Sequence, residues 1–488
     1  MPDAAPIACD LAEDAAMTSE VALVPRSMDR WRDVLSVERW DALGKTIRVA
    51  RSICAGRTVW CVNSTAAGGG VSEMLRTMLS YLAGIGLDAR WAVVDGDTEF
   101  FRITKRLHNF VHGNAGDGGV LDRRERDAYH RTMRANAAAL TSMVAPGSLV
   151  VLHDPQSAGL VEPLQRHGCA VVWRCHIGAE LVNDHTKRAW EFIEPFVFRA
   201  DRLVFSRAVY VPEQLAGRPV SIVSPSIDPF AAKNQWLDEN SVRAILSTAG
   251  LLDAGQTAAQ PLFCRLNGDT AKVEGRVMLL GGDPPEPCRP LALQVSRWDR
   301  LKDHLGVMRG FVRRCLPDTD ADLMLVGPHV DTVADDPESV NVFSELVREH
   351  AALPEAQRAR VHIVSLPMTD VEENAAIVNA LQRHATIVVQ KSLEEGFGLT
   401  VTEALWKGKP VLASAVGGIR DQIRDGRTGL LLDDPTDLDA FGDALAGLLA
   451  DPARRHELGA AAARDAHDRF LHDQHIRAWL ALAAGLAT

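Results

Sequence analysis

The stretch that most constrains this chain is residues 392–418, which places two carboxylates, Glu395 and Glu403, eight positions apart. A short β-branched run, residues 385–390, precedes it and predicts a buried strand. Residues 399–407 predict a helix, because a glycine and a proline follow directly. The order strand, turn, helix leaves unpaired backbone N–H groups and the positive end of a helix dipole at the turn.

Glycines on both sides of Phe397 form the turn between that strand and helix. The backbone at Gly396 and Gly398 therefore suits an anion or a hydroxyl-rich ligand. We expect Glu395 to accept hydrogen bonds from sugar hydroxyls and Glu403 to reach a ribose. A solvated glutamate pair on a surface helix is the alternative, and the paired glycines argue against it. The donor-binding candidates here are Gly396, Phe397, Gly398, Leu399, Thr400 and Glu403.

Length and composition are typical of an ordinary soluble globular protein. Its 488 residues suggest two to four domains, and its net charge of −11 does not favour a nucleic-acid partner. No apolar run approaches the roughly 18 residues that a membrane span needs. Residues 1–25 are acidic at the start and lack a signal-peptide pattern, so they predict a disordered leader.

The eight cysteines include no Cys-x-x-Cys pair, and no histidine spacing suits zinc. We therefore predict buried thiols, a cytoplasmic location and no bound metal. Asp95-Gly-Asp97 and Asp318-Thr-Asp320 match a two-aspartate metal pattern, but the pattern is weak and we interpret both as turns.

The first half of the chain predicts strands at 58–63, 148–153 and 170–176. Residues just past the carboxyl ends of parallel strands line the ligand crevice of an open sheet. Polar residues of the segment 104–130 are expected to join them in an acceptor pocket. The candidates at the strand ends are His176, as a catalytic residue, and Asn63, His153, Asp154 and Gln156, as acceptor ligands.

Three glycines, residues 68–70, lie between the first of these strands and an amphipathic helix. This topology predicts a phosphate- or sugar-binding turn that includes Gly69 and Gly70. It is neither a dinucleotide fingerprint nor a P-loop. A purely structural turn is an equally good interpretation.

A second α/β run follows a Gly/Pro-rich stretch. We predict a first α/β domain (1–250), a linker or inserted loop (251–290), a second α/β domain (291–465) and a C-terminal helix (466–488) that packs back toward the first domain. The expected fold is α/β, with two Rossmann-like domains facing across a cleft. Arg297 and Lys302 lie on the loop after the first strand of the second half.

The run EGFGLTVTE, followed by KGKPVLASAVGGIRDQI and GRTGLLL, resembles the retaining nucleotide-sugar glycosyltransferases of the GT-B fold. The runs NSTAAGGGVSE, VLHDPQ, WRCHI and QVSRWDRLKD, and PSIDP followed by KN, are similar to the trehalose synthase family. These matches cover most of residues 58–470. The resemblance implies a nucleotide-sugar donor on the second domain, a small sugar acceptor on the first, and backbone N–H donors from Gly417 and Gly418. It leaves a homodimer open.

The resemblance implies transfer of glucose from a nucleoside diphosphate to free glucose, giving α,α-trehalose. Arg297 and Lys302 would stabilise the leaving diphosphate, so that neither a metal nor another cofactor is needed. Front-face attack needs no enzyme nucleophile, so Glu395 would hold donor hydroxyls, with His176 on the opposite wall. A two-carboxylate glycosidase mechanism is not expected.

Two positions depart from the family pattern: Gly178 replaces an aspartate, and Glu394 replaces a basic residue. Restoring the carboxylate by Gly178→Asp is predicted to leave glucose use equal or better. One alternative is a retaining transferase, or a pseudo-glycosyltransferase, of the same fold that uses a different acceptor: another sugar, an aminocyclitol or a secondary metabolite. The other is a non-catalytic sugar or nucleotide sensor.

Overall fold

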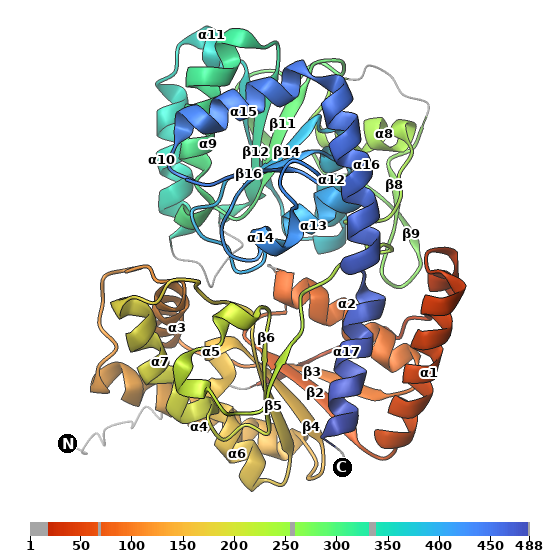
Figure 1. The fold of residues 1–488 in the computed structure, drawn as a ribbon, viewed down its shortest axis with the longest axis vertical. Helices are drawn as coiled ribbons and strands as arrows, with labels where there is room; N and C mark the ends of the chain where they lie inside the picture. The colour runs from red at the N-terminus through yellow and green to blue at the C-terminus, as the bar shows by residue number, and fades with distance from the viewer. Residues whose placement is uncertain (1–17, 67–69, 254–258, 331–337, 487–488) are drawn as a thin grey trace, which may run out of the picture.

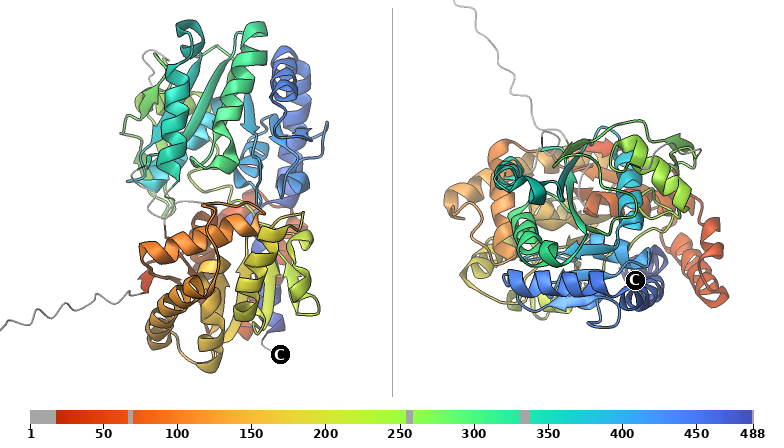
Figure 2. Two further views of the ribbon diagram at one scale, coloured as in Figure 1. Left: turned by 90° about the vertical axis from the view of Figure 1, so that its left-hand side faces the viewer. Right: turned by 90° about the horizontal axis from the view of Figure 1, so that it is seen from above.

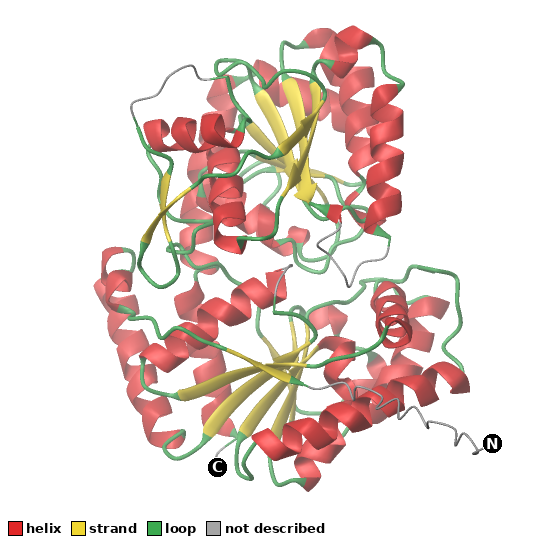
Figure 3. Cartoon of the chain, turned by 180° about the vertical axis from the view of Figure 1, so that it is seen from behind, coloured by secondary structure: helices red, strands yellow, loops and turns green. Residues whose placement is uncertain are grey.

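Two α/β domains, one above the other, make up the computed structural model, which describes residues 18–66, 70–253, 259–330 and 338–486 (Figure 1). Each domain has a seven-stranded sheet, with helices on both of its faces (Figures 2 and 3). The strand orders are β1-β3-β2-β4-β5-β6-β7 and β10-β13-β12-β11-β14-β15-β16. The predicted pair of Rossmann-like domains is confirmed.

The first sheet is parallel from β3 to β7, because its apolar, β-branched strands are covered on both faces. Residues 1–17 of the predicted leader lie outside the described residues, but the prediction is wrong for residues 19–21. They pair antiparallel with β3 and form its edge strand. The strands are β1 (Ser19–Val21), β2 (Thr58–Asn63), β3 (Asp88–Val93), β4 (Leu149–His153), β5 (Ala170–Cys175), β6 (Arg202–Phe205) and β7 (Val220–Ile222).

Four of the described first-domain helices, α1, α3, α4 and α7, begin at polar side-chain caps. Asp97 caps α3 by accepting a hydrogen bond from the Phe100 N–H, so the turn interpretation of Asp95-Gly-Asp97 is confirmed. The helices are α1 (Val37–Ile53), α2 (Gly70–Gly84), α3 (Thr98–Val111), α4 (Arg123–Met143), α5 (Asp154–Ser157), α6 (Val161–Arg166) and α7 (Asp184–Val197).

The second sheet is parallel from β13 to β16 and has an antiparallel edge strand, β10. Its strands are β10 (Met278–Leu280), β11 (Leu291–Val295), β12 (Asp322–Pro328), β13 (Val361–Leu366), β14 (Ile387–Gln390), β15 (Val411–Ser414) and β16 (Leu430–Leu432). Its helices are α8 (Glu239–Ala249), α9 (His304–Gly310), α10 (Ser339–Ala351), α11 (Glu355–Arg358), α12 (Val371–His384), α13 (Leu399–Trp406), α14 (Ile419–Gln422), α15 (Leu438–Ala450) and α16 (Pro452–Arg469).

The chain crosses between the domains twice, and the two crossings lie side by side. Ile227 on the outward crossing pairs with Leu471 on the return. After the return, α17 (His472–Gly485) packs against α1 of the first domain and buries Ile476 and Trp479 in its core.

The structure differs from the predicted linker at 251–290, because the crossing comes earlier in the chain. Helix α8 already belongs to the core of the second domain. The segment itself contains the hairpin β8 (Leu262–Cys264) and β9 (Thr270–Lys272), and then β10. Arg265 in the hairpin forms an ion pair with Asp370, which ties the segment to the second domain.

Candidate functional site

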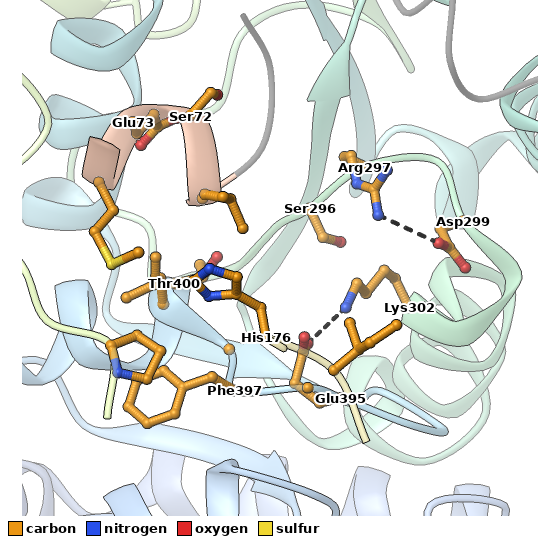
Figure 4. Close-up of a pocket in the computed structure, with 18 of the residues that line it drawn as sticks. Ser72, Glu73, His176, Ser296, Arg297, Asp299, Lys302, Glu395, Phe397 and Thr400 are labelled. Atoms are coloured by element: carbon orange, nitrogen blue, oxygen red, sulfur yellow. Dashed lines mark hydrogen bonds and ion pairs between the residues drawn. The ribbon is translucent and has the colours of Figure 1, made fainter. Parts of the chain in front are cut away.

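A cavity of about 420 Å³ lies between the domains, where carboxyl ends of strands from both sheets meet. Gly69 lies outside the described residues. Most of the other predicted site residues come together here, some of them labelled in Figure 4. They are Asn63, Gly70, His153, Asp154, Gln156, His176, Arg297, Lys302, Glu395, Gly396, Phe397, Gly398, Leu399, Thr400 and Glu403.

Gly417 and Gly418 do not line this cavity but pack behind the 395–398 turn. A Cβ on Gly417 would lie 1.7 Å from the carbonyl oxygen of Glu395, and one on Gly418 would lie 2.6 Å from the Cα of Phe397. The two glycines therefore let their loop approach the turn closely. In this structure they support the turn from behind.

The basic loop after β11 supplies the cations predicted for a diphosphate. Lys302 Nζ lies 2.6 Å from a carboxylate oxygen of Glu395, and Arg297 lies 3.7 Å from Asp299 (Figure 4). Lys105, on α3 of the first domain, lies 3.7 Å from the same aspartate. Asp299 thus pairs with one basic side chain from each domain. It lines the cavity, and the sequence analysis did not predict it.

Asp299 stays ionised because of its neighbours. Burial alone would raise its pKa, but Lys105, Arg297 and Lys302 outweigh burial and hold that pKa well below its usual range. The ionised carboxylate therefore lies within ion-pair distance of Arg297 from its own loop and of Lys105 from the first domain.

Helix α13 begins directly at the cavity. Its N-cap, Gly398, has a φ of +86°, a left-handed conformation that favours glycine, and no side chain caps the first N–H groups. Glu403, about one turn on, is 5% exposed, and burial raises its pKa although Lys233 and Lys407 act in the opposite direction. The helix therefore offers backbone donors at its start and a carboxylate further in.

Lys233 was not predicted, although it is the lysine that follows the PSIDP run. It lies on the outward crossing, with its Nζ 2.7 Å from Glu73 of α2 and 3.8 Å from Glu403 of α13. Burial would lower its pKa, but the two carboxylates raise it above its usual range. Lys233 is thus a charged link between the two domains at the Glu403 end of the cavity.

Two stacked histidines form part of the first-domain wall. His153 Nδ1 and His176 Nε2 lie 2.9 Å apart. Burial, and then the nearby Arg174, lowers the pKa of His153 to about 3 and that of His176 well below its usual value. Both rings are therefore neutral at pH 7, and one donates its N–H to the other.

Asp154 lies beside this pair in a left-handed conformation with a φ of +61°. Its carboxylate accepts the His176 backbone N–H at 2.7 Å, and its carbonyl accepts the Trp173 indole N–H at 3.1 Å. Burial raises its pKa to about 7, against the opposite effects of that hydrogen bond and of Arg174.

Helix α3 contributes His108 and His112 to the wall, from the segment predicted to line an acceptor pocket. Burial, and then Lys302, lowers the pKa of His112 to about 4. The Asn63 amide is already engaged: it accepts the Trp91 N–H at 2.8 Å and donates to the Thr65 carbonyl at 2.7 Å.

The packing at Gly178 argues against the prediction that Gly178→Asp leaves glucose use equal or better. A Cβ at Gly178 would lie 2.2 Å from Cγ of Tyr210, so an aspartate has no room unless that ring moves. Glu394, the other departure, lines the cavity. Burial and then Glu180 raise its pKa, while Arg420 lowers it.

Across the described part of the chain, no group of three or more His, Cys, Asp or Glu side chains is arranged to hold a metal ion. No helix in the same residues has the length and apolar character to cross a membrane.

The chain matches two family models, "Trehalose synthase, N-terminal domain" over residues 61–212 and "Glycosyl transferases group 1" over residues 368–465. It is 33% identical to the trehalose synthase of Pyrococcus horikoshii over 427 residues, which are 87% of this chain and 89% of that protein. The chain belongs to the trehalose synthase family. Its identity to the trehalose synthase of Rubrobacter xylanophilus is 32%, over 93% of this chain and 96% of the relative.

More distant relatives include the trehalose phosphorylase of Pleurotus pulmonarius, 26% identical over 93% of this chain and 60% of the relative. Similar folds among solved structures include a trehalose-6-phosphate synthase, OtsA (TM-score 0.65, 11% identity, 87% of this chain and 98% of that chain). Another is an α,α-trehalose-phosphate synthase (UDP-forming) from Burkholderia vietnamiensis (TM-score 0.64, 15% identity, 88% and 98%). The predicted GT-B fold is therefore confirmed, and this family member is an enzyme of the trehalose-related glycosyltransferases.

Proposed function

We propose that this enzyme transfers glucose from a nucleoside diphosphate to the anomeric hydroxyl of free glucose, with retention, and so forms α,α-trehalose. The observation that carries the proposal is the distribution of charge in the cavity. The three lysine and arginine side chains among its described lining residues are Lys233, Arg297 and Lys302. Two of them lie on the basic loop and the third beside Glu403, at the end of the cavity that would take the nucleotide.

The donor half suits a nucleoside diphosphate sugar. Charge develops on the diphosphate as the glycosidic bond breaks, and Arg297 and Lys302 lie where two cations would stabilise it. The uncapped N–H groups at the start of α13 add donors for phosphate or sugar oxygens. Glu403, charge-compensated by Lys233, is placed for the ribose hydroxyls.

The reaction proceeds by attack on the face that the leaving group departs from. The Glu395 carboxylate is engaged with Lys302 at 2.6 Å, so it serves to hold donor hydroxyls and not as a nucleophile. The departing diphosphate accepts the proton of the acceptor hydroxyl. His176, a neutral ring, contributes a hydrogen bond from the opposite wall.

The acceptor half suits a free sugar and not a sugar phosphate. Its lining residues are neutral imidazoles, the amides of Asn63 and Gln156, and the carboxyl of Asp154. A phosphate group bound here would face the carboxyl group of Asp154, and no lysine or arginine among the described residues lines this half of the cavity to offset its charge. Burying the phosphate charge without a partner is unfavourable in a desolvated site. The buried polar groups also favour an acceptor that pairs with them through hydroxyls.

The test is incubation with uridine, adenosine or guanosine diphosphate glucose, together with glucose or glucose 6-phosphate. We expect a non-reducing disaccharide from glucose, with both anomeric centres α by NMR, and transfer that survives strong chelation of divalent ions. Formation of trehalose phosphate alone would contradict the acceptor assignment. Loss of activity in chelator with recovery in magnesium would contradict the metal-independent mechanism.

A second candidate keeps the chemistry and changes the acceptor to another sugar or an aminocyclitol. The packing of Tyr210 against Gly178 favours it, because a ring here replaces the carboxylate expected from the resemblance. Extension of another acceptor in the same assay, with glucose unused, would identify this case.

A further inference from the structure

We propose that Tyr210 is a positioning residue that holds the Glu395–Gly396 turn from the opposite domain, and that position 178 is glycine to admit its ring. Tyr210 ends a 3-10 turn, Ala208–Tyr210, that follows β6 in the first domain, and it does not line the cavity. The kinetic part of this inference rests on the proposed transferase activity, whereas the contact itself does not.

The Tyr210 phenol reaches across the domain boundary to the backbone of the turn. Its hydroxyl donates to the Gly396 carbonyl oxygen at 2.8 Å, and the Glu395 carbonyl oxygen lies 3.2 Å away. The side chain is 2% exposed, and burial raises its pKa to about 12, so the phenol keeps its proton at neutral pH. The phenol therefore remains a hydrogen-bond donor to the turn at neutral pH.

Glycines from both domains make room for this tyrosine. A Cβ at Gly178 would lie 2.2 Å from its Cγ, and a Cβ at Gly417 would lie 2.8 Å from its hydroxyl oxygen. A Cβ at Gly396 would lie 3.2 Å from the His176 carbonyl oxygen, so the turn also approaches the end of β5 closely. No larger residue fits at 178 or 417 while the tyrosine keeps this position.

An ion-pair group braces the same contact. Arg207, three residues before Tyr210, lies 2.5 Å from Glu180 of its own domain and pairs with Asp421 of the second domain. Its guanidinium also lies over the Tyr210 ring, 5.1 Å from the centroid.

Glu395 is thus held at both of its ends, by different domains. Its backbone turn is fixed by Tyr210 of the first domain, and its carboxylate by Lys302 of the second. A rotation between the domains that breaks the tyrosine contact removes one of these two restraints. Precise placement of donor hydroxyls then depends on domain closure, which is a means of coupling closure to reaction.

The first test compares Tyr210→Phe with Tyr81→Phe. Tyr81 is equally buried, and its hydroxyl bonds at 3.1 Å to Asp228, at the start of the outward crossing and away from the Glu395–Gly396 turn. For Tyr210→Phe we expect kcat to fall about tenfold while donor KM changes less than about threefold, since one buried hydrogen bond is lost without loss of a donor contact. For Tyr81→Phe we expect a lower Tm and a kcat within about twofold of the wild type.

Hydrogen exchange supplies a readout that needs no substrate. Amides of residues 392–398 should exchange faster in Tyr210→Phe and at the wild-type rate in Tyr81→Phe. Unchanged exchange in this segment would overturn the contact. Faster exchange with unchanged kcat would overturn the positioning role, and absence of transfer by the wild type would instead count against the proposed function.

The second test adds a side chain at position 178 and then removes the ring at position 210. Gly178→Asp alone should lose more than about 100-fold in kcat, because the ring and the new side chain occupy one space. In the double variant Gly178→Asp, Tyr210→Ala, the activity should recover above that of the single Gly178→Asp variant. Losses that simply multiply in the double variant would overturn the shared-space argument.

Discussion

The second domain contributes the proposed donor wall of the cavity, around Asp299, and the first domain the proposed acceptor wall, around Asp154. The two walls differ in how the charge of the carboxyl group is set. On the donor wall, Asp299 has cations on three sides, and its pKa is held far below the usual value in spite of burial. On the acceptor wall, Asp154 has only the buried Arg174 as a cation, and burial raises its pKa to about 7. The imidazoles of His153 and His112 are driven to the neutral form by the same burial.

This difference shows that burial alone does not determine the charge of a site. Partners within a few ångströms decide it, because an opposite charge offsets the desolvation penalty and an apolar neighbour does not. Under the proposed function, the wall that would bind a diphosphate has its charges paired with one another until the ligand arrives. The wall that would bind a hexose presents mostly neutral donors and acceptors.

The largest expected effect comes from removing a charge on the donor wall. Lys302→Met should lower kcat/KM about 100- to 1000-fold. Removing one oriented donor from a desolvated site typically costs about 2.7–4 kcal/mol of transition-state stabilisation, which corresponds to this loss. The substitution also leaves the Glu395 carboxylate, 11% exposed, without its partner. Steady-state kinetics measure the loss.

Arg300→Ala is the matched control, because Arg300 lies on the same loop but is 61% exposed and pairs with Glu345 at the surface. Its kcat/KM should stay within about twofold of the wild type. Full activity in Lys302→Met would remove the distinction between a charged and a neutral wall.

On the acceptor wall, the expected effect is on stability and depends on pH. The pKa of Asp154 is about 7 in the folded protein and about 3.9 in the unfolded chain. Between these two pKa values the Asp154 carboxyl holds a proton in the folded protein but not in the unfolded chain. The stabilisation that this proton gives the folded protein is therefore complete below the unfolded pKa and is lost as pH rises through 7. Asp154→Asn keeps a residue that tolerates the left-handed backbone and removes this titration.

We therefore expect the free energy of unfolding of the wild type, relative to Asp154→Asn, to fall with rising pH by on the order of 2–3 kcal/mol between pH 4 and pH 7.5. Urea titrations of both proteins at several pH values measure it. The difference cancels the opposite contribution of His153 and His176, which are buried neutral in both proteins. A difference that does not vary with pH would show that the Asp154 carboxyl has the same pKa in the folded and unfolded protein.

The smallest expected effect is at the link between the walls. Lys233→Met should raise the donor KM about tenfold and leave kcat at saturating donor nearly unchanged, because ribose contacts are similar in the ground and transition states. Lys233→Arg, which keeps the charge near Glu73 and Glu403, should recover most of the affinity. A fall in kcat with unchanged KM would assign Lys233 to the chemical step instead.

The donor wall was easier to predict from sequence because its residues are close together in the chain. Glu395 and Glu403 belong to one strand–turn–helix unit whose local geometry follows from glycine and helix signals. Asp299 and Lys233 escaped prediction because each acquires its surroundings from the opposite domain.

For the acceptor wall, the sequence predicted which residues lie at strand ends but not how their side chains contact one another. The alternation of strands and helices indicates that residues 153 and 176 end neighbouring strands. It does not reveal that the two rings bond to each other or that Tyr210 fills the space at Gly178. These contacts depend on side-chain packing between elements far apart in sequence, for which a single sequence contains no direct signal.

The return of the chain to the first domain has a consequence for biosynthesis. Helix α17 adds Ile476 and Trp479 to a core whose other members include Trp31 and Leu79, which precede the second domain in the chain. The described strands and helices of the second domain lie between these two parts of the core in sequence. On the ribosome, we therefore expect the second domain to complete its core first, while this core of the first domain waits for α17 to emerge.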